Sequence, residues 1–117
     1  MKLVPLPLIR HKDTEIVVTG NRIRVRIPDL MILTEDLLAA IGGKRATITA
    51  DMPSPLLVVE VVSPGKANED RDYRYKRSEY AARGILEYWI VDPEISKITI
   101  LSLVDGLYEE AIFEDDK

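Results

Sequence analysis

The chain contains no cysteine, so disulfide bonds and thiolate metal sites are excluded, in agreement with a reducing cytoplasm. Its only histidine, His11, precedes every motif considered below and is expected in a surface loop rather than in a catalytic centre. Long apolar runs are missing too: none approaches the length of a membrane span, and the N-terminus lacks the apolar core of a signal peptide. We therefore expect a cytoplasmic protein with no membrane partner.

An excess of positive charge is also lacking, because the net charge is −4 at pH 7. This balance argues against strong nonspecific adsorption to nucleic acid, but it leaves room for a locally basic cleft. The basic residues cluster in three places: Arg22, Arg24 and Arg26; Lys44 and Arg45; and Arg71, Arg74, Lys76 and Arg77. The stretch 109–117 is acidic and is predicted to be a solvated tail. A length of 117 residues fits a single domain, 1–117.

Turn signals and apolar periodicity divide the chain into strands around one long helix. The predicted elements are hairpins at 15–27 and 97–113, strands at 56–62 and 85–91, and helices at 35–41 and 68–83. Thr34 is placed to cap the first helix, and Gly84 to end the second. This order predicts an α/β or α+β fold in which at least one helix covers a sheet.

Two carboxylates lie where the strand patterns predict apolar side chains. Glu60 interrupts the aliphatic strand at 56–62, where burial of an ionised carboxylate without a partner costs at least several kcal/mol. Asp29 follows Pro28 and falls on the strand face that carries Ile27, opposite to the face that carries the arginines. Each acid taken singly is explained by a local hydrogen bond, turn or cap, so neither alone indicates a site.

A lysine is out of place in the same way. Lys76 falls on the inward stripe of the helix at 68–83 and lies in line with Asp72 and Tyr80 at four-residue spacing. A lone inward lysine can extend its stem to the surface. Two acids and a base that point into one crevice can instead satisfy one another, and an oxygen-rich site of this kind suits Mg²⁺ or Mn²⁺.

Four sequence strings, in this order, resemble the Uma-two endonuclease family of the PD-(D/E)XK nuclease superfamily: RIPDL, LLVVEVVSPG, DRDYRYKRSEYAARGI and EYWIVDP. The resemblance runs from about Arg22 to Tyr108, which is most of the chain. It implies a restriction-endonuclease-like mixed sheet with a long covering helix. It also implies cleavage of phosphodiester bonds in DNA with the help of Mg²⁺ or Mn²⁺.

The resemblance also assigns roles by motif. It implies that Asp29 is the aspartate of the PD pair, that Glu60 is the acid of the (D/E)XK element, and that the backbone carbonyl of Val61 is a third metal ligand. The motif's lysine is absent, since position 62 is a valine, and Lys76 matches a lysine that has migrated to the following helix. Lys76 would stabilise developing charge or position the attacking water.

Other residues are expected to act around this centre. Asp72 and Tyr80, on the same helix side, could orient Lys76. Contacts to the phosphate backbone could come from Arg22, Arg24 and Arg26. The more ordinary interpretation of these three arginines is a solvated outer strand face. Tyr88 and Trp89 are most simply explained as core residues.

Family members normally begin with a further segment that includes a helix packed on the sheet, and this chain is expected to be short at its N-terminus. A sheet face left bare in this way favours a homodimer. Two alternatives to the nuclease therefore stay open. The first is a catalytically silent homologue that serves as a dimeric binding module. The second is a structural domain in which Glu60 and Lys76 form a buried salt bridge, although such pairs seldom add stability.

Overall fold

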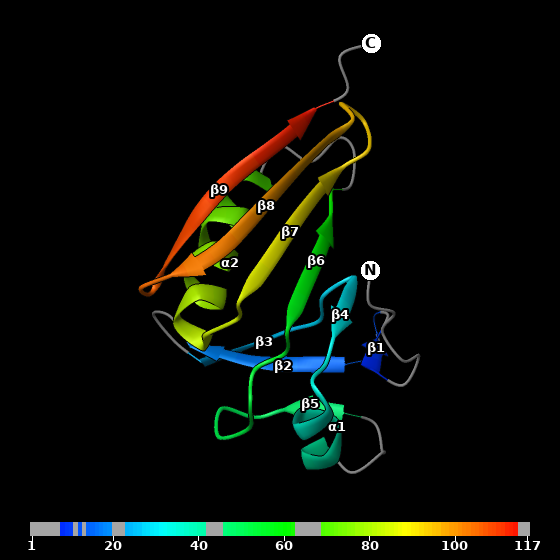
Figure 1. Cartoon of the computed structure of the whole chain (residues 1–117), viewed down its shortest axis with the longest axis vertical. Coiled ribbons are helices and arrows are strands. Elements are labelled where there is room, and N and C mark those ends of the chain that lie inside the picture. The colour runs from blue at the N-terminus through cyan, green and yellow to red at the C-terminus, as the bar shows by residue number, and fades with distance from the viewer. Residues whose placement is uncertain are drawn as a thin grey trace.

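The computed structural model describes residues 8–10, 12, 14–19, 23–41, 46–62 and 69–114, with side chains described for all of these except 19, 23–25, 46 and 69–74. The elements, in chain order, are β1 (Ile9–Arg10), β2 (Thr14–Thr19), β3 (Ile23–Arg26), β4 (Leu30–Ile32), α1 (Glu35–Ile41), β5 (Ala46–Ile48), β6 (Leu57–Val61), α2 (Glu69–Arg83), β7 (Glu87–Asp92), β8 (Lys97–Val104) and β9 (Leu107–Glu114) (Figure 1). Among the described residues, no helix is long and apolar enough to cross a membrane.

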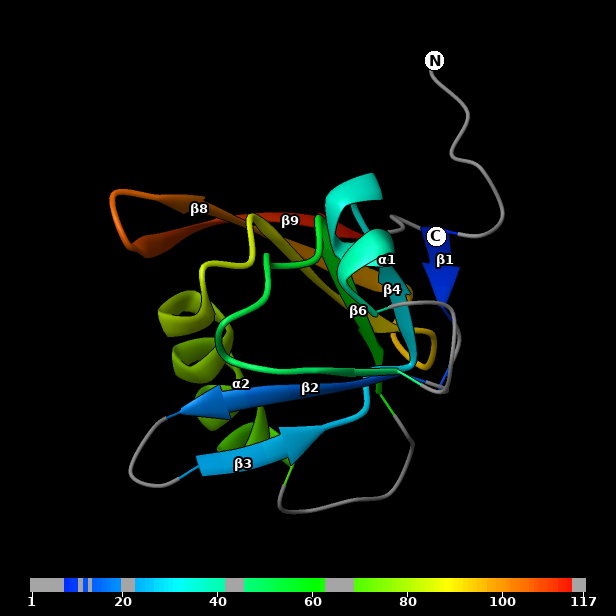
Figure 2. The ribbon, with the colours of Figure 1, turned by 90° about the horizontal axis from the view of Figure 1, so that it is seen from below.

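The strands form two sheets. The larger has six strands in the order β1-β4-β6-β7-β8-β9, and the smaller has three in the order β3-β2-β5. In the larger sheet β6 and β7 are parallel and all other neighbours are antiparallel. As its apolar sequence predicts, β6 is a central strand with a neighbour on each side. Figure 2 shows α2 between the two sheets, where it contacts β2 and β9.

A single cluster of buried side chains joins both sheets and both helices. Its most deeply buried members include Ile16, Val18, Met31, Leu37, Ile48, Val58, Tyr80, Tyr88 and Leu101. Tyr80 of α2 and Tyr88 of β7 meet edge to face, with ring centroids 4.9 Å apart and ring planes at 79°. This contact fixes the described part of α2 beside β7, the direct neighbour of the strand that carries Glu60.

Local sequence signals predicted most elements. Thr34 caps α1 as expected, since its Oγ1 accepts a hydrogen bond from the Leu37 N–H at 3.1 Å. Gly84 follows α2 with a φ of 85°, a conformation that favours glycine. Asp105 and Gly106 both have positive φ, as a two-residue hairpin turn between β8 and β9 requires. The mixed α+β class is confirmed, whereas the long covering helix of a restriction-endonuclease-like fold stays a prediction.

One predicted strand face is wrong. Ile27 was expected to point inward, but 52% of its surface is exposed. Arg26 points inward instead: it pairs across the hairpin with the fully buried Ile16, and paired residues share a face. The physical reason is a buried carboxylate on α2, Glu79, which binds the Arg26 guanidinium. Of the predicted acidic tail, residues 109–114 belong to β9, and 115–117 lie outside the described residues.

Candidate active site

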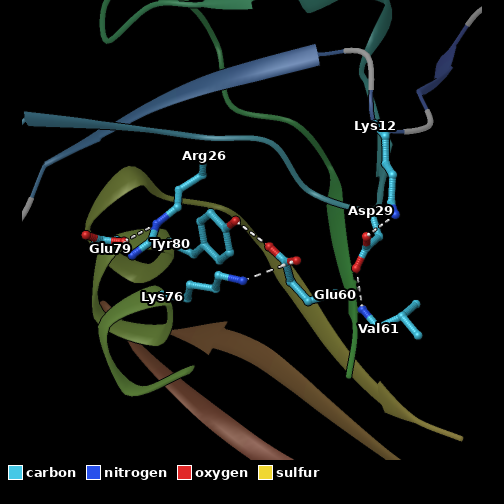
Figure 3. A network of polar contacts seen from close by, with 8 residues as sticks. All are labelled: Lys12, Arg26, Asp29, Glu60, Val61, Lys76, Glu79 and Tyr80. Carbon is cyan, nitrogen blue, oxygen red and sulfur yellow. Dashed lines mark hydrogen bonds and ion pairs between the residues drawn. The ribbon is translucent and has the colours of Figure 1, made fainter. Parts of the chain in front are cut away.

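Glu60 lies in β6 with only 5% of its surface exposed. Among the described side chains, its carboxylate has two partners, both from α2 (Figure 3). The Tyr80 hydroxyl donates a hydrogen bond to Oε2 at 2.8 Å, and the Lys76 ammonium lies 3.4 Å from Oε1. A buried strand can therefore carry this acid because a helix supplies it with a hydrogen-bond donor and a cation.

The helix presents both partners because they are four residues apart. Side chains at this spacing lie one above the other on the same face of a helix. Tyr80 is anchored by its ring in the core, and its hydroxyl extends beyond the core to Glu60. The Lys76 side chain is 16% exposed, so its stem is largely buried while its ammonium reaches the same carboxylate. The inward direction predicted for Lys76 and Tyr80 agrees with these contacts.

Asp29 follows Pro28 and immediately precedes Leu30, the first residue of β4. Leu30 pairs with Val59 of β6, so the Asp29 side chain lies beside the next part of β6. Its Oδ2 accepts a hydrogen bond from the Val61 N–H at 2.7 Å, and its Oδ1 lies 3.3 Å from the ammonium of Lys12. Asp29 and Glu60 are thus joined through the backbone of β6, as Figure 3 shows.

The environment changes the acidity of two of these groups. Burial raises the pKa of Glu60, and the nearby Asp29 charge raises it further, while Lys76 and the Tyr80 hydrogen bond oppose the increase. Burial also raises the pKa of Tyr80 well above its ordinary range, and the charge of Glu60 adds to this effect. Tyr80 therefore stays protonated and remains a hydrogen-bond donor to the carboxylate.

A second ion pair, which the sequence patterns did not predict, lies next to this cluster. The Arg26 Nε and Nη2 atoms both lie 2.8 Å from Oε1 of Glu79, and the two side chains are 15% and 5% exposed. The signal was present in the helix: Lys76, Glu79, Tyr80 and Arg83 follow the spacing i, i+3, i+4, i+7 of a single face. The expected stripe included Lys76 and Tyr80 but passed over the glutamate between them.

Several predicted residues lie outside the description. Arg22 is not described, and the side chains of Arg24 and Asp72 are not described either. Their expected roles, contact with phosphate and orientation of Lys76, stay predictions. Arg26 is described, and its bond to a buried carboxylate holds its guanidinium inside the protein, which works against a contact with DNA. Trp89 donates from Nε1 to the Glu87 carboxylate at 3.0 Å, and Tyr88 is fully buried, as expected of a core residue.

The family model described as "Uma2: Putative restriction endonuclease" matches residues 6–117. The chain belongs to this family. The resemblance read from its sequence strings is thereby confirmed. A comparison with curated proteins finds no match.

Among solved structures, this Uma2 chain is similar to a "putative nuclease belonging to DUF820" from Anabaena variabilis ATCC 29413. The TM-score is 0.56 at 13% sequence identity, which shows a shared, nuclease-like fold. The similarity covers 95% of this chain and 57% of that protein. The chain therefore spans little more than half the length of the solved nuclease.

The two carboxylates of this site are of the donor type expected for Mg²⁺ or Mn²⁺, the cofactor that the sequence resemblance predicts. The carboxylates of Asp29 and Glu60 offer oxygen donors, which hard cations such as Mg²⁺ prefer, and the Val61 carbonyl stays a third ligand expected from the family resemblance. The charge of Asp29 raises the pKa of Glu60, and a cation between the two acids would relieve this repulsion. Across the described part of the chain, no group of three or more His, Asp or Glu side chains is arranged to hold a metal.

Proposed function

We propose that this chain is a metal-dependent endonuclease that hydrolyses phosphodiester bonds in DNA. Asp29, Glu60 and the Val61 carbonyl would hold Mg²⁺ or Mn²⁺, and Lys76 would assist. The observation that supports this proposal is the buried Glu60 carboxylate, which β6 carries at high cost and which Lys76 and Tyr80 hold in one orientation. Membership of a family described as restriction endonucleases supports a catalytic role for this carboxylate.

When bound, the cation supplies Lewis acidity at the scissile phosphate and a water molecule of lowered pKa. The chain's own residues would orient the two carboxylates and stabilise the charge that develops on the phosphate. Tyr80 fixes one oxygen of Glu60 by its hydrogen bond, and the Val61 N–H fixes one oxygen of Asp29. Lys76 places a positive charge next to Glu60, where it can stabilise the negative charge that develops on the phosphate.

The wider assignments belong to the same proposal. Arg22 and Arg24 are proposed to contact the DNA backbone, since a clustered positive charge is the usual feature of phosphate contacts. Asp72 is proposed to help orient Lys76 from the preceding turn of α2. The protein is proposed to act in the cytoplasm as a homodimer. Each of these assignments derives from the sequence and the family resemblance.

Cleavage of supercoiled plasmid DNA tests the proposal. The expected result is nicking with Mg²⁺ or Mn²⁺, no nicking with a chelator, and loss of activity in Glu60→Ala. Glu110→Ala is a matched control, because Glu110 also binds a cationic residue of α2 but is exposed. Activity that survives both the chelator and Glu60→Ala would rule out the proposed centre.

A second candidate function is a catalytically silent, dimeric binding module with the nuclease fold. The observation that favours it is that Lys76 and Tyr80 already satisfy Glu60 without a metal. The two candidates differ in their response to metal: a metal site predicts that Mg²⁺ or Mn²⁺ raises the melting temperature of the protein but not of Glu60→Ala. A silent module predicts no shift in either protein.

A further inference from the structure

The ion pair between Arg26 and Glu79 joins the strand that leads to Asp29 with the helix that carries Lys76 and Tyr80. Arg26 is the last residue of β3, and the chain reaches Asp29 three residues later. Glu79 precedes Tyr80 in α2 and lies one helical turn after Lys76. The charge of Arg26 also acts on Tyr80, whose pKa it lowers against the larger effect of burial. The pair therefore lies directly beside the groups that hold Glu60 (Figure 3).

The stability of the fold does not explain this pair. Removing two charges from water costs several kcal/mol for each ion, and replacement of a buried ion pair by apolar residues is often neutral or stabilising. The inward Arg26 also brings a charge next to Ile16, its fully buried apolar partner in β2. The pair is better explained by what its charges do to their neighbours.

The decisive neighbour is Lys76. It lies three residues before Glu79 in the helix, and side chains at this spacing are within reach of each other. By this spacing, Glu79 is a second buried carboxylate that could attract the ammonium now paired with Glu60. Two short contacts from Arg26 to Oε1 of Glu79, both 2.8 Å, engage that carboxylate, while Lys76 lies 3.4 Å from Glu60.

We propose that Arg26 is a positioning residue: by binding Glu79, it prevents this carboxylate from competing with Glu60 for the ammonium of Lys76. Arg26 then pairs with Glu79, and Lys76 pairs with Glu60. Loss of the arginine would draw Lys76 toward Glu79 and leave Glu60 without its cation. The consequence for DNA cleavage rests on the proposed nuclease function, whereas the charge arrangement itself does not.

The test is a double-mutant cycle, made in the full chain and repeated in different backgrounds. The coupling between Lys76→Met and Glu60→Gln is measured by urea unfolding, first with Arg26 present and then in Arg26→Gln. The expected result is loss of most of the coupling in Arg26→Gln. The coupling returns in Arg26→Gln combined with Glu79→Gln, because the competing charge has been removed.

A purely structural role for the pair makes a different prediction. Arg26→Gln would then lower the stability of every variant equally, and the coupling between positions 60 and 76 would stay the same, which would overturn the proposal. Should Arg26→Gln fail to fold, Arg26→Lys replaces it, because a lysine keeps the charge but donates from one atom. A smaller but measurable loss of coupling is expected there, and an unchanged coupling would again overturn the proposal.

Plasmid cleavage separates this inference from the proposed function. If the chain is a nuclease, the single variant Arg26→Gln loses activity, and the added Glu79→Gln restores it in parallel with the coupling. A full-length chain that shows the expected couplings but never cuts DNA refutes the nuclease and supports the positioning role. If the chain cuts DNA, and Arg26→Gln changes neither the rate of cleavage nor the coupling between positions 60 and 76, the positioning role alone is refuted.

Discussion

The described part of α2 is attached to the rest of the protein in two different ways. Near its C-terminal end, Arg83 donates hydrogen bonds to uncharged acceptors: the Ser54 hydroxyl at 2.8 Å and the backbone carbonyls of Thr49 and Met52, both at 2.9 Å. In the preceding two turns, the side chains of Lys76, Glu79 and Tyr80 instead contact the charged groups of Glu60 and Arg26. The attachment through Arg83 holds the loop before β6 in place. The attachment through Lys76, Glu79 and Tyr80 consists of buried ion pairs and a hydrogen bond to a carboxylate.

This difference indicates which region is structural and which is functional. A cation bound to carbonyl oxygens fixes backbone positions and needs no further explanation. Buried acids and bases in the core add little stability over apolar residues of the same shape, so their presence needs another reason. The charged region is the one that contains the residues of the proposed centre, whereas the Arg83 region contains none of them.

The largest expected effect comes from removal of a buried cation. Lys76→Met leaves Glu60 without its ion-pair partner, and we expect a loss of about 3–5 kcal/mol in the free energy of unfolding at neutral pH. Arg77→Met, one residue further along α2, removes an ion pair with Glu110 in which both side chains are more than 40% exposed. We expect a loss of about 1 kcal/mol or less there. Urea unfolding of the two variants side by side measures the difference, and equal losses would contradict the contrast.

The next effect is the loss of a single hydroxyl. Tyr80→Phe keeps the ring that packs against Tyr88 but removes the hydrogen bond to Glu60. Hydrogen bonds to charged groups contribute about 1.5–3 kcal/mol, so a loss of stability in this range is expected. If the chain is a nuclease, cleavage should fall by about 10–100-fold, as for other groups that orient metal ligands. Tyr108→Phe is the control, because it removes a buried hydroxyl that donates to the Ile85 carbonyl, and it should lower the stability without lowering the rate of cleavage.

The attachment through Arg83 tests the other side of the comparison, because its loss should affect stability but not cleavage. Arg83→Met removes three hydrogen bonds and should cost about 1–3 kcal/mol, because acceptors in a partly buried region lose their donor. The rate of plasmid cleavage by the folded variant should stay the same, since the described hydrogen bonds of the Arg83 side chain go to the loop before β6. A folded Arg83→Met that cannot cut DNA would show that the two regions are not separate in function.

Most of the fold could be predicted because its signals are local. The turn at Asp105 and Gly106 and the aliphatic run of β6 each depend on neighbours in the sequence. The short strands β4 and β5 were not predicted, because three residues are too few to show a period. The face of β3 was predicted wrongly because alternation defines two faces without saying which one is buried.

The site could be predicted in part for the same reason. The sequence indicated Glu60 because it interrupts an aliphatic strand, and it indicated Lys76 and Tyr80 because they share the inward side of a helix. The structure brings these three residues into contact. Glu79 was missed because its partner, Arg26, lies 53 residues away, and a glutamate in a helix next to an arginine-rich segment has the appearance of a solvated residue. Only the folded structure shows that the two are buried together.

The smallest expected effect is a difference in pH dependence between the two regions. Burial raises the pKa of Glu60, so its contribution to the stability of the metal-free protein is greatest below its ordinary pKa of 4.5 and is lost as the pH rises through the raised value. In the loop held by Arg83, a hydrogen bond from Thr49 lowers the pKa of Asp51 below 3.8. The contribution of Asp51 is therefore present above that value and is lost as the pH falls.

Two variants measure these opposite trends in the presence of a chelator. The free energy of unfolding of the wild type relative to Glu60→Gln should decrease as the pH rises, whereas that relative to Asp51→Asn should increase. Both changes should be small, because Lys76 and Tyr80 oppose the effect of burial on Glu60 and because Asp51 is exposed. If both differences in the free energy of unfolding changed with pH in the same direction, the protein would stabilise the ionised form of Glu60, as it does for the exposed Asp51. The contrast between the two regions of α2 would then lose its electrostatic basis.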